Sequence, residues 1–384
     1  KMRILEQDLP GGFAGDSGNP EVFAAFPRFK DAQFEASYPF GRVSLKDDDT
    51  PIDATIEAWN PLIPHHTDDS SLPMGMLTVT LKNKSKETIE ASLSMLMCNI
   101  IGCDGIEFDL KDNVTESAET AGWKGMRWHK AREEKKPTVG TMAILMKGGD
   151  IRVARRWKFR DRPWEGERLG ILDEILEKGF IQDDDPNAPC PPSPRDTWDS
   201  SVHSLLSLAP GETKTVQILV TWHFPWRNVE LGWNFSGSPD DKIRGNHYAT
   251  RFKDATDVAA KVIPALDSLR KRTVEFVQSV AKRRVPAALK EAALFNLATL
   301  NSHTCFRLED GSFFAFEGCS GTNGCCAGSC THVWNYEEAT IDLFPDLHRS
   351  MIENHLNFGL SPKGAQRFRQ SIPIKNAIWG LAAA

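Results

Sequence analysis

The spacing of apolar residues changes once along this chain of 384 residues, and the change separates two kinds of secondary structure. Over residues 77–81, 89–97, 142–146 and 216–222, apolar side chains recur at every second position. A period of two is typical of half-buried β-strands. Clusters of Gly, Pro, Asn and Asp separate these segments, as turns do in an antiparallel sheet. The first two thirds of the chain are therefore predicted to form a large antiparallel β-sandwich of two packed sheets.

In the last third, apolar residues return every three to four positions, which is the spacing of amphipathic helices. The pattern predicts one helix over residues 258–280 and a second that begins near Pro286 and runs through Leu289, Ala293, Leu297 and Leu300. A third helix is predicted over residues 337–357, with Leu343, Leu347 and Met351 buried. Consecutive helices without intervening strands indicate a separate α layer.

The change of period divides the chain into three predicted parts. They are a β-sandwich domain at 1–254, a linker helix at 255–284 and the start of an α-helical domain at 285–384. A few helices make a poor closed core, so we expect more protein to follow Ala384. The stretch Asp183–Pro194 holds five prolines and is predicted to be an irregular surface segment.

Composition and charge exclude several classes of function. An apolar fraction of 40% is enough for sizeable cores. The net charge of −6, with both signs interspersed, argues against nucleic acid as the main partner, because phosphate binding needs concentrated Lys and Arg. No apolar run approaches the roughly 20 residues that span a bilayer. We expect a soluble protein, and the sequence leaves open whether it is cytoplasmic or exported.

The segment Phe314–Tyr336, FAFEGCSGTNGCCAGSCTHVWNY, has the highest density of chemically reactive side chains in the chain. Glu317 follows the apolar run 313–316 and opens a glycine-rich loop. Loops held by a rigid scaffold often carry function. A carboxylate held in this way can act as a nucleophile or a general base, although a solvent-exposed loop carboxylate is the alternative.

Four of the eight cysteines lie in the same loop, in the spacing Cys319-x5-Cys325-Cys326-x3-Cys330. This spacing does not contain the paired CxxC of a structural zinc site, so a loop-closing disulfide or buried thiols are favoured. The acidic triplets Asp47–Asp49 and Asp183–Asp185 lack the spaced ligands of a calcium loop and are predicted to be solvated. No metal and no cofactor are predicted.

Five separated segments occur in an order that is typical of one enzyme family. They are EAWNPLIP (57–64), DDSSLP (68–73), WHFP (222–225), NHYATRF (246–252) and a last stretch, 309–345, that includes EDGSFFAFEG, THVWNYE and LFP. In these segments the chain resembles the non-lysosomal glucosylceramidases and bacterial β-glucosidases of glycoside hydrolase family 116. The resemblance extends from about residue 55 to the end of the chain.

This resemblance implies a retaining β-glycosidase in which an N-terminal β-sandwich precedes an (α/α)6 barrel. It implies that Glu317 is the nucleophile, because the family nucleophile occupies a Glu-Gly step after an aromatic run. The acid/base of the family is an Asp in a Thr-Tyr-Asp-like motif, which does not occur before Ala384. Because a retaining site needs two carboxylates roughly 5 Å apart, the fragment alone is expected to be inactive. The implied substrates are β-glucosides, including glucosylceramide-like lipids.

Polar residues around the predicted third helix are candidates for binding the sugar. They are Thr331, His332, Asn335 and Glu337, which could form hydrogen bonds with sugar hydroxyls. Alternatively, these residues could cap the helix. Trp334, with the nearby Tyr336, could stack on a pyranose ring or belong to the core.

A different class of function stays possible at this point. The chain could be a non-catalytic carbohydrate-binding or structural β-sandwich module that binds glycans or supports a partner domain. The two hypotheses differ in the length of the native open reading frame, because only the enzyme requires further helices and a second carboxylate.

Overall fold

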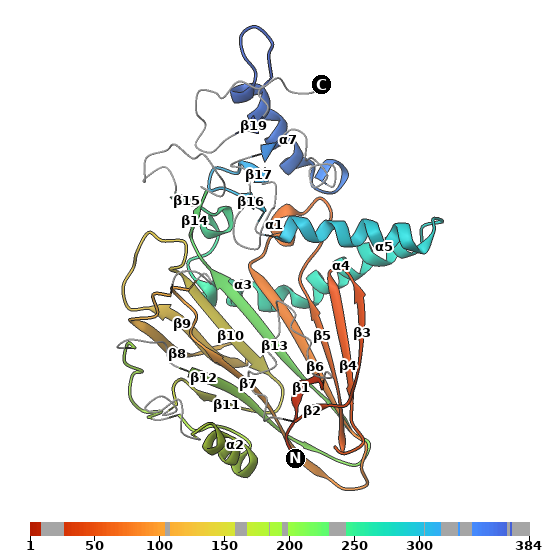
Figure 1. The fold of residues 1–384 in the computed structure, drawn as a ribbon, viewed down its shortest axis with the longest axis vertical. Helices are drawn as coiled ribbons and strands as arrows, with labels where there is room; N and C mark the ends of the chain where they lie inside the picture. The colour runs from red at the N-terminus through yellow and green to blue at the C-terminus, as the bar shows by residue number, and fades with distance from the viewer. Residues whose placement is uncertain are drawn as a thin grey trace.

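The computed structural model describes residues 1–8, 27–103, 108–157, 167–183, 185–193, 199–229, 243–302, 304–315, 329–330, 340–366 and 369–370. Within these ranges a large β-sandwich forms the lower part of the molecule in Figure 1, and helices cross its upper end. The antiparallel β-rich N-terminal part that the apolar pattern predicts is therefore confirmed.

The sandwich consists of an eight-stranded sheet and a three-stranded sheet, both antiparallel. In spatial order the larger sheet contains β3 (Asp31–Ser37), β4 (Phe40–Lys46), β5 (Ile52–Trp59), β6 (Met74–Asn83), β13 (Thr213–His223), β10 (Thr141–Lys147), β9 (Trp123–Lys130) and β8 (Asn113–Thr120). The smaller sheet contains β11 (Asp150–Ala154), β12 (Asp199–Leu208) and β7 (Ile89–Cys98). All four segments that alternate in the sequence form strands.

Both faces of the large sheet are buried around its central strands. On one face, Val216 and Ile218 of β13 pack against Val202 and Leu206 of the smaller sheet. The neighbouring Leu219 points to the opposite face, because successive side chains of a strand alternate. The sheet is therefore the middle layer of the molecule.

Two helices cover this second face (Figure 1): α3 (Ala255–Val262) and α4 (Leu266–Ala281). Val258 and Val262 pack with Leu219 in a core between the helices and the sheet. The single predicted helix is divided by a short 3-10 turn at Ile263–Ala265. Pro264 accounts for the break, because proline has no N–H for the helical hydrogen bond.

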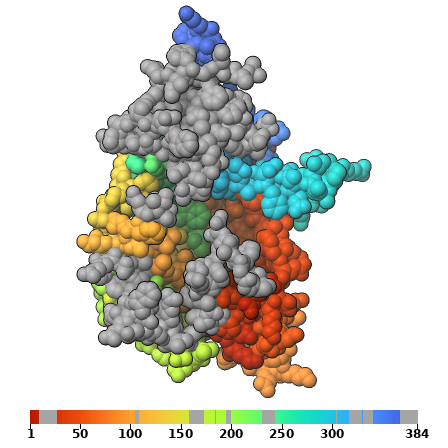
Figure 2. All heavy atoms as spheres, in the orientation of Figure 1, coloured from red at the N-terminus to blue at the C-terminus, as the bar shows by residue number. Residues whose placement is uncertain are grey.

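The next helix, α5 (Ala287–Asn296), continues into a 3-10 turn at Leu297–Asn301, and Figure 2 shows it projecting beyond the sandwich. It begins directly after Pro286, as predicted. Of the apolar residues along this segment, Leu297 is buried whereas Leu289 is 60% exposed.

A short hairpin, β16 (Cys305–Arg307) and β17 (Phe313–Ala315), follows α5. Residues 340–343 are helical, and after an interruption at Phe344 the chain continues as α7 (Pro345–Asn354) and a π-helical turn at His355–Gly359. Leu347 and Met351 are buried, as the helical spacing predicts.

The remaining described elements are one helix of 12 residues, α2 (Glu167–Lys178), and several short ones. The short ones are β1 (Ile4–Gln7), β2 (Arg28–Phe29), α1 (Thr67–Ser70), β14 (Trp226–Asn228), β15 (Ile243–Gly245), a 3-10 turn at His247–Thr250, β18 (Ser329–Cys330) and β19 (Arg369–Gln370). None of the helices described is both long and apolar enough to cross a membrane.

The prolines of segment 183–194 do prevent regular structure, but the prediction of a surface segment is wrong for several of its residues. Asp183 is buried and forms an ion pair with Arg155, with 2.7 Å between Oδ2 and Nε. Burial raises the pKa of the Asp183 carboxyl, but the hydrogen bonds from Arg155 outweigh this and hold the pKa below its usual value. Ser193 is also buried and donates to the carbonyl of Leu110 over 2.8 Å.

The other acidic triplet is likewise not fully solvated. Asp47 is buried and pairs with Arg3, with 2.7 Å between Oδ2 and Nε. One aspartate of each triplet thus forms an ion pair with an arginine. In the part of the chain that the structure describes, no three His, Cys, Asp or Glu side chains converge as a metal site would require.

Candidate functional site

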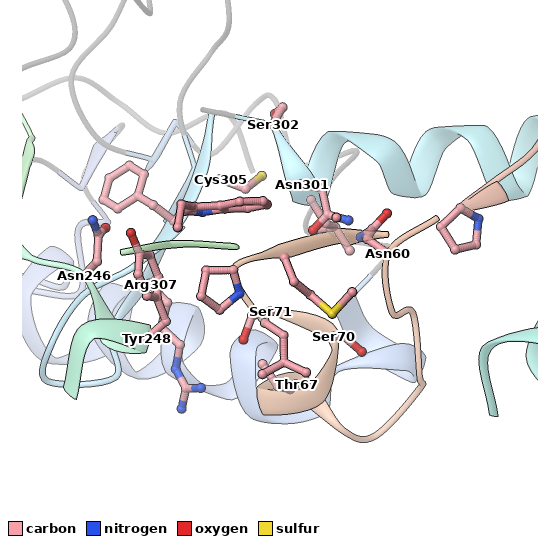
Figure 3. Close-up of a pocket in the computed structure, with 18 of the residues that line it drawn as sticks. Asn60, Thr67, Ser70, Ser71, Asn246, Tyr248, Asn301, Ser302, Cys305 and Arg307 are labelled. Atoms are coloured by element: carbon pink, nitrogen blue, oxygen red, sulfur yellow. The ribbon is translucent and has the colours of Figure 1, made fainter. Parts of the chain in front are cut away.

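A cleft of about 710 Å³ lies where the end of the large sheet meets the β16–β17 hairpin and the turn after α5 (Figure 3). The end of β5, the start of β6 and the end of β13 line one wall. The hairpin and the turn at Leu297–Asn301 supply another. Its volume is in the range that is typical of small-molecule sites.

Every one of the five segments singled out in the sequence contributes to this cleft. Asn60, Ser70, Trp222, Tyr248 and Phe313 each represent one segment in its lining. Figure 3 shows Asn246, Tyr248 and Arg307 on one side, with Asn60, Ser70 and Asn301 on the other. Strand pairing explains part of this convergence, because Met74 of β6 lies opposite Thr221 of β13. Segments that are far apart in the sequence therefore form one site.

Tyr248 and Asn246 hold the chain where it leaves β13. The Tyr248 hydroxyl donates to the carbonyl of Phe224 over 2.8 Å and accepts from the Phe224 N–H over 2.9 Å. Asn246 Nδ2 donates to the same carbonyl over 2.8 Å. Burial raises the pKa of Tyr248 to about 12, so its hydroxyl is neutral at physiological pH. Its role is to position the cleft wall rather than to transfer a proton.

The loop between β5 and β6 is fixed at several points. Ser70 Oγ accepts from the N–H of Ile63 over 2.8 Å and donates to the carbonyl of the same residue over 3.0 Å. Asp69 pairs with Arg272 of α4, with 2.8 Å between Oδ2 and Nη1. These contacts hold the loop in position at the edge of the cleft.

Two arginines also line the cleft. Arg307 of β16 pairs with Asp68, with 3.0 Å between Nη1 and Oδ1. Arg227 of β14 stacks on Phe306, with 3.9 Å between its guanidinium carbon and the ring centroid. Burial lowers the pKa of Arg227 to about 10. The Arg227 side chain is still cationic at neutral pH.

The residues predicted to react with or bind the sugar follow the cleft-lining residue Phe313 in the sequence. They lie outside the described residues. Strand β17 ends at Ala315, and its three residues are buried. The residues outside the described ranges are Glu317, Thr331, His332, Trp334, Asn335 and Glu337. The loop cysteines 319, 325 and 326 also fall outside them, whereas the described Cys98, Cys103, Cys190 and Cys305 are thiols.

Among the polar contributors that sequence reasoning missed are Arg227, Arg307 and Asn301. Asn301 Nδ2 donates to the Tyr38 hydroxyl over 2.7 Å, a contact that links residues 263 positions apart. For Arg227, a signal was present, because it follows the aromatic segment 222–226 directly. Arginine and aromatic residues are enriched among the residues that contribute most to binding.

Comparison with protein families identifies the sandwich. The model described as "beta-glucosidase 2, glycosyl-hydrolase family 116 N-term" matches residues 6–269, which is more than half of the chain. The chain belongs to glycoside hydrolase family 116. The match confirms the resemblance of the separated segments and indicates an enzyme family that acts on carbohydrates. Curated proteins gave no match to this family 116 chain.

Among solved structures, the family 116 chain is similar to a putative kojibiose phosphorylase from the human microbiome. The sequence identity is 10%, and the TM-score is 0.26. The match covers 72% of this chain and 26% of the phosphorylase chain, so the chain spans about a quarter of that protein's length. A TM-score this low does not establish a shared fold. The (α/α)6 barrel and the three domain boundaries stay predictions.

Proposed function

We propose that this family 116 chain is the N-terminal part of a retaining β-glycosidase that hydrolyses β-glucosides, with Glu317 as its nucleophile. The observation that carries the proposal is the cleft at the β16–β17 hairpin. All five family segments line it, and Phe313 of its lining belongs to the strand that ends two residues before Glu317. Substrates of this class include glucosylceramide-like lipids.

In the proposed mechanism, the Glu317 carboxylate attacks the anomeric carbon while the bond to the leaving oxygen breaks. A carboxylic acid protonates that oxygen, and water later hydrolyses the glycosyl-enzyme ester with the same group acting as base. The two carboxyl groups of such a pair lie about 5–5.5 Å apart. We propose that the second is an Asp encoded outside residues 1–384.

The polar residues after the cysteine-rich loop would bind the sugar. Thr331, His332, Asn335 and Glu337 would hydrogen-bond its hydroxyls, and Trp334 would stack on the ring face. Such contacts orient the anomeric carbon toward the nucleophile, which lowers the entropic part of the barrier.

The decisive experiment uses protein expressed from the full reading frame and an aryl β-glucoside. Glu317→Gln preserves size but removes the nucleophile, so kcat should fall on the order of 10³-fold or more. Glu309→Gln is the matched control, because Glu309 lies in the hairpin turn, pairs with Arg244 over 3.0 Å and is partly exposed. Normal turnover by Glu317→Gln would remove the assignment.

A second measurement tests the covalent intermediate directly. A 2-deoxy-2-fluoro β-glucoside with a good leaving group slows hydrolysis of the ester, so an adduct should accumulate on the peptide that contains Glu317. NMR of the first product should show the β-anomer. An α-anomeric first product would indicate an inverting enzyme and contradict the proposed mechanism.

A further inference from the structure

Arg227 is an unsatisfied donor in the wall of the cleft. Its Nε is buried and has no hydrogen-bond partner among the described residues. Within the same residues its guanidinium forms one hydrogen bond, from Nη1 to Oδ1 of Asn246, which is long at 3.4 Å. One face of the group stacks on Phe306 at 3.9 Å, so its edges are left to donate.

The neighbouring arginines differ from Arg227 in their charge partners. Arg307, which also lines the cleft, pairs with Asp68 at 3.0 Å. Arg244 of the adjacent strand β15 pairs with Glu309 at 3.0 Å. Within the described ranges, no carboxylate lies within ion-pair distance of Arg227. The cleft therefore contains one arginine whose charge is not balanced by a described acidic group.

Burying an unpaired guanidinium is unfavourable, because the lost hydration is not replaced. Stacking on Phe306 recovers a part of that energy. The depressed pKa of Arg227 has the same physical origin, and the group is still protonated at neutral pH. A pair of anionic oxygens placed in the cleft would supply the missing interaction with Arg227.

The geometry of the donor selects the kind of anion. A guanidinium stacked on a ring presents its N–H groups in one plane, and this fork matches a planar carboxylate bidentately. We propose that Arg227 binds a carboxylate group of the ligand that occupies this cleft. Arg227 is thus a specificity-determining residue for an acidic ligand.

The chemistry of glycoside cleavage indicates which part of the ligand carries the acid, and this step rests on the proposed function. The transition state develops positive charge at the sugar ring. A cation beside that ring would oppose the reaction, since like charges repel. The carboxylate therefore belongs to the leaving-group side. Among β-glucosides, those whose aglycone is acidic should bind in preference to those with a neutral aglycone, such as glucosylceramide-like lipids.

Two ligands of nearly the same shape test the inference: 4-carboxyphenyl β-D-glucoside and its neutral analogue, 4-carbamoylphenyl β-D-glucoside. Their affinities for the 384-residue chain are measured by calorimetry or ligand-observed NMR, without the need for turnover. The wild type should bind the acid at least about tenfold more tightly than the amide, as expected for a charge-assisted hydrogen-bond pair. Arg227→Met, which keeps a flexible apolar stem over Phe306, should abolish this preference.

Arg152→Met is the matched control, because Arg152 lies on β11 of the smaller sheet and pairs with Asp150 on the surface. It should keep the full preference. Arg227→Lys keeps the charge but not the planar fork, so it should lose most of the preference even if the methionine variant does not fold. Circular dichroism establishes that each variant is folded.

Equal affinity of the wild type for the acid and the amide would overturn the inference. A preference for the acid that persists in a folded Arg227→Met, or that is undiminished in Arg227→Lys, would also overturn it. The outcome is separable from that of the proposed function. Loss of turnover in Glu317→Gln without acid preference in the wild type removes only the role of Arg227. Acid preference together with normal turnover in Glu317→Gln removes only the proposed nucleophile.

Discussion

The hydroxyl of Thr67 donates a 2.6 Å hydrogen bond to Oδ1 of Asp346, which joins the loop after β5 to the first turn of α7. Thr67 is buried and also lines the cleft. Close to it, the N–H of His65 donates to the carbonyl of Leu343 over 2.7 Å. These contacts attach the C-terminal helical residues to the sandwich at the cleft rim. The width of the cleft therefore depends on contacts between parts of the chain that are distant in sequence.

Replacing Thr67 by valine keeps the shape of the side chain but leaves Asp346 without this donor. A hydrogen bond to a charged group contributes about 1.5–3 kcal/mol, and the exposure of Asp346 places the expected loss at the lower end. Hydrogen exchange should show faster opening of α7. Thr80→Val on β6 is the control, because its contact with Thr215 is 3.4 Å long and exposed. Equal protection of α7 in the wild type and Thr67→Val would contradict this prediction.

The core between the large sheet and α3 can be tested at Leu219. This side chain is fully buried and packs with Val258 and Val262. Leu219→Ala should lower the free energy of unfolding by about 2–5 kcal/mol, because it removes buried methyl groups and leaves a cavity. Leu289→Ala, on the exposed side of α5, should change it by less than about 0.5 kcal/mol. Urea unfolding measures both variants, and similar losses would show that the helices do not depend on this core.

The strands were predictable because alternation records burial directly. Val216 and Ile218 face one core, and their period of two follows from the geometry of an extended chain. The break between α3 and α4 also has a local cause, Pro264, which an unbroken helical pattern ignores. Leu289 shows the limit of periodicity, because spacing places a residue on a helix face but does not establish what covers that face.

Long-range contacts could not be predicted in the same way. The burial of Asp183 depends on Arg155, which follows β11 directly and lies 28 positions earlier in the sequence. In the cleft, the five segments were recognised as a set, but their meeting depends on strand order, as in the pairing of Met74 with Thr221. For Arg227 the sequence offers only its place after the aromatic segment 222–226. Its unusual feature, an Nε without a partner among the described residues, is visible only in three dimensions.

The start of α3 offers a further test. Asp254 caps this helix, and its Oδ1 accepts from the N–H groups of Thr256 at 2.8 Å and Asp257 at 2.9 Å. Asp254→Ala should lower stability by about 1 kcal/mol, because two amide groups lose their acceptor. Asp254→Asn keeps an oxygen at the cap and should retain most of that stability. Thermal unfolding distinguishes the two variants, and equal losses would indicate that the cap is not the source of the effect.

His203 is buried between the smaller sheet and the segment after α2. Its Nε2 accepts from the N–H of Ile181 over 3.2 Å, and the Ser201 hydroxyl lies 2.8 Å from the same atom. Its Nδ1 lies 2.8 Å from the Ser94 hydroxyl. The ring is therefore neutral, with the proton on Nδ1, because Nε2 faces a backbone donor.

Burial lowers the pKa of His203 from 6.5 to about 4. The unfolded chain therefore takes up this proton at a higher pH than the folded chain. The contribution of neutral His203 to stability is complete above pH 6.5 and falls as the pH drops from 6.5 toward about 4. At about 1.4 kcal/mol per pKa unit, the loss approaches roughly 3 kcal/mol near pH 4. In urea unfolding across this range, His203→Gln should show a shallower pH dependence than the wild type, whereas the surface variant His66→Gln should not differ from it. A slope that is unchanged in His203→Gln would assign the acid sensitivity to the buried carboxylates, such as Asp183, instead of this histidine.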